Sequence, residues 1–164
     1  MARYSATWTT VTSATLADTS AAVNAAYPGS LRGGGAAVLA KINEVSVSGE
    51  DTASTVTTFV LARASTLSVG ALSVGNNAPL DVQATAPGTI MNWGNTAATS
   101  GAQRAATLYL LSPSLNTYGG IYRWQARYGE EITVFGTAAN AGEVLMSSKT
   151  GAGKSSGHII YEVV

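Results

Sequence analysis

The chain has 164 residues, no cysteine and a formal net charge of zero, with nine lysines and arginines balanced by nine aspartates and glutamates. Charged residues make up only 11% of it, against about 25% in ordinary globular domains. This composition excludes disulfides and thiolate metal sites. It also lacks the clustered basic excess of nucleic-acid-binding proteins, so we expect no nucleic-acid partner.

The length predicts a single domain, 1–164, which can bury about 70% of its unfolded surface without staples. The N-terminal stretch MARYSATWTT has no apolar core of a signal peptide. No segment approaches the ~20 apolar residues of a membrane helix, so we expect no membrane partner. Because near-zero net charge favours association, we interpret much of the surface as covered by copies of the chain or by another protein. A monomer coated with hydroxyl groups is the alternative.

The first 35 residues combine a predicted strand, Arg3–Thr12, with a short predicted helix, Asp18–Gly29. Asp18 suits an N-cap, an alanine-rich body follows, and Pro28-Gly29 would end the helix. A glycine run, Gly33–Gly35, comes next. Residues 1–35 could therefore form an extended arm, or a strand plus a short helix within the domain.

The next predicted strand, Ala36–Gly49, alternates in character but changes phase along its length. Ala40 and Ile42 lie on one face, whereas Val45 and Val47 lie on the other. This phase change predicts a β-bulge near Glu44.

Short β-branched and aromatic runs separated by Gly, Pro, Asn and Ser predict further strands along the chain. About eight or nine strands are expected: Arg3–Thr12, Ala36–Gly49, Ser54–Ala64, Thr89–Gly94, Ala105–Leu111, Ile121–Tyr128, Glu131–Gly136, Glu143–Ser148 and His158–Val164. Two long loops, Ser65–Gly88 and Asn95–Gln103, are expected to carry binding or assembly surfaces.

This pattern favours an all-β fold, because the strands do not alternate with helices. An antiparallel β-sandwich is the architecture that fits it. With eight or nine strands and at most one short helix, a jelly roll is preferred.

A glycine-rich segment, Ser148–Gly157, resembles the end of a phosphate-binding loop in Gly153-Lys154-Ser155. That motif needs a small residue, normally glycine, where Ser148 stands, and a helix after the loop. A β-branched segment follows instead, so we interpret this stretch as a turn between two strands.

The only histidine, His158, is expected at the start of the last strand. Metal sites usually draw on several ligands, and general acid–base pairs face each other across a substrate. The adjacent pairs Glu50-Asp51 and Glu130-Glu131 would point to opposite faces of a strand. We therefore expect no metal, no cofactor and no enzyme activity, although a Ser-His-Asp arrangement around His158 stays open.

The segment Ile121–Tyr128 predicts a strand with an aromatic face, formed by Tyr122, Trp124 and Tyr128, directed inward. Arg123 and Arg127 would lie on the opposite face. They could pair with carboxylates of a neighbouring copy, because arginine is suited to bidentate pairing, or they could be solvated.

Exposed aromatic rings would instead form a sugar-binding platform, the third interpretation of this segment. Trp93, between two asparagines, could lie near a loop tip and make similar contacts. The candidate interface residues are therefore Trp93, Tyr122, Arg123, Trp124, Arg127, Glu130 and Glu131.

Three parts of the chain together resemble a known group of proteins. They are ATWTTV (Ala6–Val11), NNAPLD with GNTAATSG (Asn76–Asp81 and Gly94–Gly101), and YRWQARYGEEITVFG (Tyr122–Gly136). In this order they resemble small β-sandwich proteins encoded in phage and prophage structural gene clusters. Tyr128-Gly129 stands where that group has a proline before the Glu pair, and the turn after Phe135 lacks its double proline.

The resemblance implies a virion structural protein that decorates or cements the capsid surface as a trimer. Its expected partners are copies of itself and the major capsid protein, and the resemblance implies no catalytic residues. Two rivals stay open. One is a receptor- or glycan-binding module of a phage tail or fibre, since a β-sandwich hosts both roles. The other is a hydrolase that depends on His158.

Overall fold

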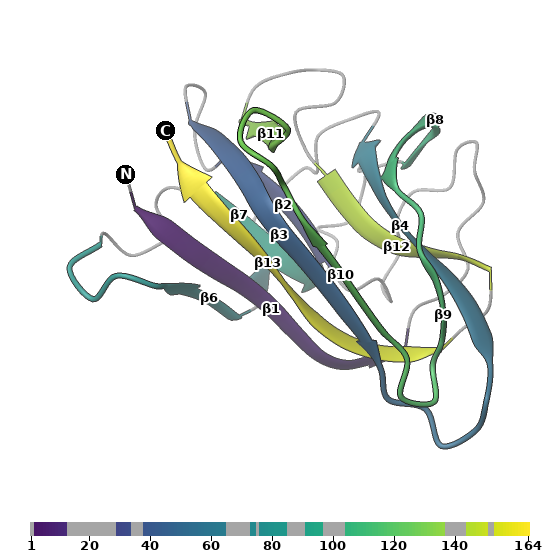
Figure 1. Ribbon diagram of the computed structural model, residues 1–164. Coiled ribbons are helices and arrows are strands. Elements are labelled where there is room, and N and C mark those ends of the chain that lie inside the picture. The colour runs from purple at the N-terminus through teal and green to yellow at the C-terminus, as the bar shows by residue number, and fades with distance from the viewer. Residues whose placement is uncertain are drawn as a thin grey trace.

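The computed structural model describes residues 2–12, 29–33, 38–64, 73–74, 76–84, 91–96, 104–136, 144–150 and 153–164. These residues form thirteen β-strands in two antiparallel sheets that pack face to face (Figure 1). The predicted all-β sandwich is confirmed. Within the described ranges there is no helix that is long and apolar enough to cross a membrane.

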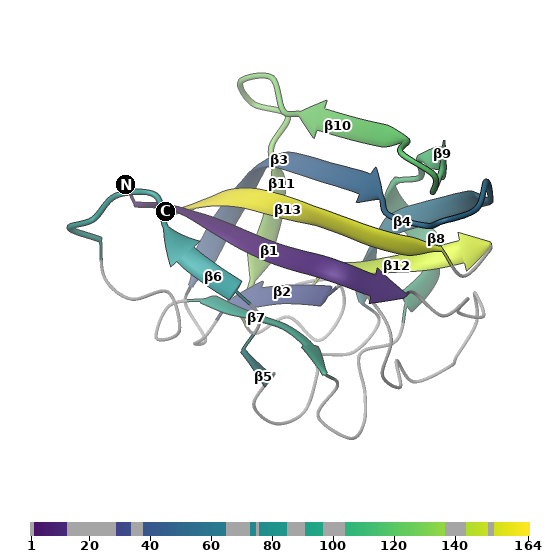
Figure 2. The ribbon, with the colours of Figure 1, turned by 90° about the horizontal axis from the view of Figure 1, so that it is seen from below.

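One sheet has six strands, in the order β10-β3-β13-β1-β6, with β11 also paired to β3. Their bounds are β1 (Arg3–Thr12), β3 (Leu39–Gly49), β6 (Asn76–Pro79), β10 (Ile121–Gln125), β11 (Ile132–Phe135) and β13 (Lys154–Val163). Figure 2 shows β10 at one edge of this sheet and β6 at the other.

The second sheet has seven strands, in the order β5-β7-β2-β12-β4-β8, with β9 also paired to β4. Their bounds are β2 (Gly29–Gly33), β4 (Val56–Ala64), β5 (Ser73–Val74), β7 (Met91–Thr96), β8 (Arg104–Leu111), β9 (Ser114–Asn116) and β12 (Val144–Thr150).

The strand order is that of a jelly roll. Setting aside β5, β6, β7, β9 and β11 leaves two four-stranded sheets, β10-β3-β13-β1 and β2-β12-β4-β8, which is the eight-stranded, two-sheet arrangement of that fold. Strands β5, β6 and β7 lie between β4 and β8 in sequence. They extend both sheets on one side, because β6 pairs with β1 and β7 pairs with β2.

All nine predicted strands occur, but several details were wrong. The described residues contain four strands that were not predicted, β2, β5, β6 and β9. Two of them, β5 and β6, fall inside the loop expected at 65–88, and β7 includes the first two residues of the loop expected at 95–103. These strands have two to five residues and form through tertiary pairing rather than through a strong local pattern.

The predicted arm, 1–35, is described only in part. Its strand Arg3–Thr12 is confirmed as β1, and it is an interior strand of the six-stranded sheet rather than an extended arm. The predicted helix Asp18–Gly29 lies outside the described residues, apart from Gly29, which begins β2.

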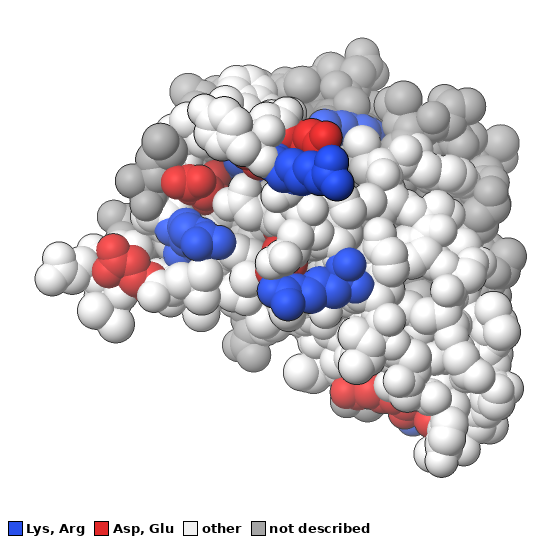
Figure 3. Space-filling model, viewed as in Figure 1, with Lys and Arg blue, Asp and Glu red and all other residues white. Residues whose placement is uncertain are grey.

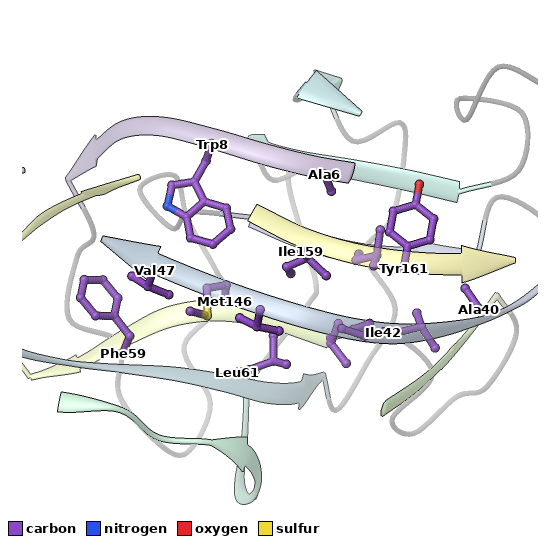
Figure 4. Close-up of a cluster of buried hydrophobic side chains, with 14 of the residues drawn as sticks. Ala6, Trp8, Ala40, Ile42, Val47, Phe59, Leu61, Met146, Ile159 and Tyr161 are labelled. Atoms are coloured by element: carbon purple, nitrogen blue, oxygen red, sulfur yellow. The ribbon is translucent and has the colours of Figure 1, made fainter. Parts of the chain in front are cut away.

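The core lies between the two sheets and contains large aromatic and aliphatic side chains (Figure 4). Tyr4 and Tyr161 are fully buried neighbours on β1 and β13, and their ring centroids lie 5.4 Å apart in a stacked arrangement. The Tyr161 hydroxyl donates a hydrogen bond to Asn77 Oδ1 at 2.7 Å. Burial raises the pKa of Tyr161, because the phenolate would lose its hydration.

A β-bulge in β3 keeps its apolar residues inside the core, as the sequence predicted. Ile160 of β13 pairs with Glu44, but the next residue, Tyr161, pairs with Ile42. The additional residue, Asn43, shifts the phase of the strand. As a result Ile42 and Val45 both face the core, while Glu44 faces the outer surface of the sheet beside its neighbours on β10 and β13.

Candidate functional site

The candidate site lies on the outer face and the edge of the six-stranded sheet, around β10. Burial alternates along this strand: Tyr122 and Trp124 are half-buried against the core, whereas Ile121, Arg123 and Gln125 are exposed. The predicted inward aromatic face is therefore confirmed for Tyr122 and Trp124.

The prediction was wrong for Tyr128. The strand ends at Gln125, and Tyr128 lies in a turn, fully exposed. Gly129 follows with φ of +86°, a conformation that glycine adopts readily and that an extended strand does not contain.

Strands β10 and β11 lie one after the other along β3 and are separated by a projecting loop, 126–131. β10 pairs with residues 44–48 of β3 and β11 pairs with residues 39–42, so the loop leaves the sheet opposite the bulge at Asn43. Figure 2 shows it as the green loop that projects between the two strands. It carries Arg127 and Glu130, which are exposed, and Glu131.

Backbone hydrogen bonds fix the position of Glu131. Its Oε1 accepts a hydrogen bond from the Gly129 N–H at 3.1 Å. The pKa of Glu131 is lowered, first by its own N–H and then by that of Gly129, because both interactions favour the charged carboxylate.

Glu44, the residue after the bulge at Asn43, is the centre of a polar cluster on the outer face. Arg123 donates to it twice, from Nε to Oε1 and from Nη2 to Oε2, both at 2.8 Å. Gln125 Nε2 donates to Oε2 at 2.9 Å, and His158 Nε2 lies 2.9 Å from Oε1. The carboxylate therefore has four close polar contacts from β10 and β13, and Glu44 is only 7% exposed.

The surroundings of Glu44 stabilise its negative charge. Its pKa falls from 4.5 to about 2, with the hydrogen bonds from Arg123 as the largest cause. Partial burial opposes this, and the contacts with His158 and Gln125 add to it. The hydrogen bonds with Glu44 in turn raise the pKa of Arg123.

This arrangement answers one of the questions that the sequence left open. Arg123 was expected either to pair with a neighbouring copy or to be solvated. Its guanidinium instead forms a bidentate ion pair with Glu44 of the same chain. Figure 3 shows this face of the molecule with charged side chains in small separate groups on an otherwise uncharged surface.

His158 differs from the prediction in its position. It was expected at the start of the last strand, but β13 begins at Lys154, so His158 lies within the strand. There it is half-buried and contacts Glu44. The segment after Gly153 is a strand, as the interpretation of the glycine-rich stretch required.

Sequence reasoning missed this cluster because its members are far apart in the chain. Glu44 is separated from Arg123 by 79 positions and from His158 by 114. The sequence contained one signal, the phase change near Glu44. It indicated that the Glu44 side chain does not face the core with the neighbouring apolar side chains. The register that places β10 and β13 on either side of it could not be read from the sequence.

The candidate interface residues do not form one patch. Trp93 belongs to β7 in the other sheet, where it is paired with Leu31, and its side chain lies outside the described set. The other six lie on β10 or in the loop that follows it.

The described residues contain no group of three or more His, Asp or Glu side chains that could hold a metal ion. Each oxygen of the Glu44 carboxylate has two close polar contacts within the chain. The cluster therefore stabilises the negative charge of Glu44 at a fixed position. Compared with protein-family models, with curated proteins and with solved structures, the chain matches none.

Proposed function

We propose that this protein is a structural protein of a virion, which decorates or cements a phage head shell and associates with copies of itself. The observation that carries the proposal is the internal pairing of charge on the outer face of the six-stranded sheet. Arg123 is neutralised by Glu44 of the same chain, so this face can approach another protein without burying an unpaired guanidinium. An unpaired charge would oppose such contact, because burying it is costly.

Composition supports the same proposal. Only 11% of the residues are charged and the net charge is zero, which suits a surface covered by protein. A rigid sandwich repeated many times around a shell needs only modest individual contacts, because symmetry repeats each contact. The resemblance to phage β-sandwich proteins adds the virion location, the major capsid protein as partner and three copies as the expected assembly.

The proposal is tested on particles rather than on the isolated chain. An antibody against the purified protein should label the heads of particles purified from a lysate that contains the gene. Mass spectrometry should find the chain in those particles at a fixed ratio to the major capsid protein. Intact particles without the chain, or labelling confined to tails, would refute a role on the head.

The glycan-binding alternative receives less support from the site. Tyr122 and Trp124 pack against the core and are only partly exposed, which leaves little ring area for stacking on a sugar. A glycan array with the purified protein separates the two functions, because saturable sugar binding that is lost in Trp124→Ala would favour the tail or fibre module.

A further inference from the structure

The two edges of the six-stranded sheet differ in what they offer to another strand. An exposed edge presents unpaired N–H and C=O groups that can pair with a further strand. Which residues present them follows from the hydrogen bonds to the neighbouring strand, because these groups alternate between the two sides of a strand.

The edge formed by β6 is blocked. The Leu80 N–H donates to Arg3 O at 2.8 Å, so the backbone groups of Leu80 face β1. Because these groups alternate in direction along a strand, the backbone groups of Asn77 and Pro79 face away from β1. Pro79 has no N–H to donate, and a proline on an edge strand is a common protection against pairing.

Among the described residues, no strand pairs with the outer edge of β10. Gly49 N–H donates to Gly120 O at 2.8 Å, and Ala126 N–H donates to Asn43 O at 2.9 Å. By alternation Tyr122 and Trp124 also face β3, which leaves the N–H and C=O groups of Ile121, Arg123 and Gln125 facing outward. The adjoining β11 is different, because Arg63 Nη1 donates to the Thr133 carbonyl there.

The side chains around this edge suit a second copy of the same strand. In an antiparallel pair centred on Trp124, Arg123 lies opposite Gln125 of the second copy, so the two arginines are not opposed. The two half-buried Trp124 rings become a cross-strand aromatic pair, a favourable arrangement in sheets. Ile121, which is 75% exposed, lies opposite Arg127 of the second copy, just beyond the end of β10.

We propose that β10 pairs with β10 of a second copy about a two-fold axis at Trp124, which joins two six-stranded sheets into one. This inference rests on the self-association in the proposed function and names its surface. Two-fold pairing requires an even number of copies: a dimer, or two trimers joined if the expected trimer also forms.

Amide hydrogen exchange at low and high protein concentration tests the pairing residue by residue. In the separate chain the Ile121, Arg123 and Gln125 amides should exchange quickly, and those of Tyr122, Trp124 and Ala126 slowly. On association the Arg123 and Gln125 amides should slow by about tenfold or more, because each faces the other residue of the second copy, while those of Tyr122, Trp124 and Ala126 serve as the internal control.

Two variants test the same edge by light scattering. Gln125→Pro removes the outward N–H that faces Arg123 of the second copy, and Ile121→Lys places a charge on the edge opposite Arg127 of the second copy. Each should weaken association by about tenfold or more. Val82→Lys is the matched control, because Val82 is 96% exposed beyond the blocked β6 edge, and association should persist. Circular dichroism shows whether each variant is folded.

The outcomes separate the two proposals. An oligomer whose Arg123 and Gln125 amides stay fast, a trimer alone, or unchanged association in both folded edge variants overturns the β10 pairing and leaves the proposed function standing. A wild-type monomer at all concentrations overturns the pairing together with self-association. Pairing of β10 with a strand of a different protein would appear as protection only after that protein is added, and it would also overturn the two-fold contact.

Discussion

Glu44 keeps its charge in a nearly buried position because Arg123, Gln125 and His158 surround it. Arg123→Ala removes the largest cause of the low pKa of Glu44. We expect the pKa to rise from about 2 towards 4.5, measured by NMR titration of the Glu44 carboxyl group. Arg127→Ala is the control, since Arg127 is exposed in the loop 126–131, and it should leave the titration unchanged. A shift of equal size in both variants would contradict the assigned pairing.

The low pKa of Glu44 also predicts how stability depends on pH. A carboxylate with a pKa lowered by folding stabilises the protein above its unfolded value of 4.5. This contribution is lost as the pH falls through the folded value of about 2, because protonation then removes the charge. We expect the free energy of unfolding of the wild type to decrease from pH 5 to pH 2 more steeply than that of Glu44→Gln. Parallel curves from urea unfolding would contradict this prediction.

Two glycines are required for different physical reasons. A Cβ atom on Gly157 would lie 2.1 Å from Ser46 O and 2.5 Å from the Trp8 ring, so Gly157→Ala should cost about 3 kcal/mol or more through overpacking. Gly119 has φ of +79° with open space around it, so Gly119→Ala should cost about 1–2 kcal/mol through backbone strain alone. Chemical denaturation of both variants measures the difference. If Gly157→Ala lost less unfolding free energy than Gly119→Ala, β3 and β13 would have to separate easily to make room for the methyl group.

At the scale of the strands, Arg63 of β4 reaches across the sandwich to the Thr133 carbonyl of β11. This contact holds the short strand β11 against the second sheet. Arg63→Met keeps most of the aliphatic stem and removes the donor, at a cost of about 1 kcal/mol. We expect about fivefold faster exchange at the amides of β11, with little change at those of β10. Equal acceleration in β10 and β11 would mean that the two strands open as one unit.

Local patterns predicted much of the sheet. Alternation placed Tyr122 and Trp124 inward, and the phase change placed a bulge near Glu44, because the two-residue period of a strand assigns each side chain to a face. The prediction was wrong for Tyr128 because the strand ends at Gln125. Tyr128 lies in the turn beyond it, next to Gly129, which has a positive φ. Apolar alternation alone does not show where a strand stops.

The polar cluster could not be predicted in the same way. It depends on the pairing of β3 with both β10 and β13, and a single sequence contains no direct record of which distant strands are neighbours. The jelly-roll order was anticipated only as a class, since strand number and the absence of helix alternation favour it. Strands β5 and β6, which with β7 widen both sheets, have only two and four residues and follow no local signal.

For the whole molecule, two kinds of contact could join copies of the chain: ion pairs between loops, or strand pairing along β10. They differ in the source of the association energy. Contacts between Arg127 and a neighbouring Glu130 or Glu131 would be exposed ion pairs, which salt screens over a Debye length of about 10 Å at 0.1 M. Strand pairing along β10 depends on backbone hydrogen bonds and apolar contact, which salt affects much less. With Arg123 already paired to Glu44, the second kind is expected to dominate.

The assembly should therefore tolerate salt. Between about 0.05 and 0.5 M salt we expect the association constant to change by less than about threefold, as measured by sedimentation equilibrium. Arg127→Ala should behave like the wild type in both conditions, because exposed ion pairs contribute little. A loss of about tenfold or more in high salt, abolished by Arg127→Ala, would instead place the contact at the loop 126–131, because only an interface made by its exposed charges responds in that way.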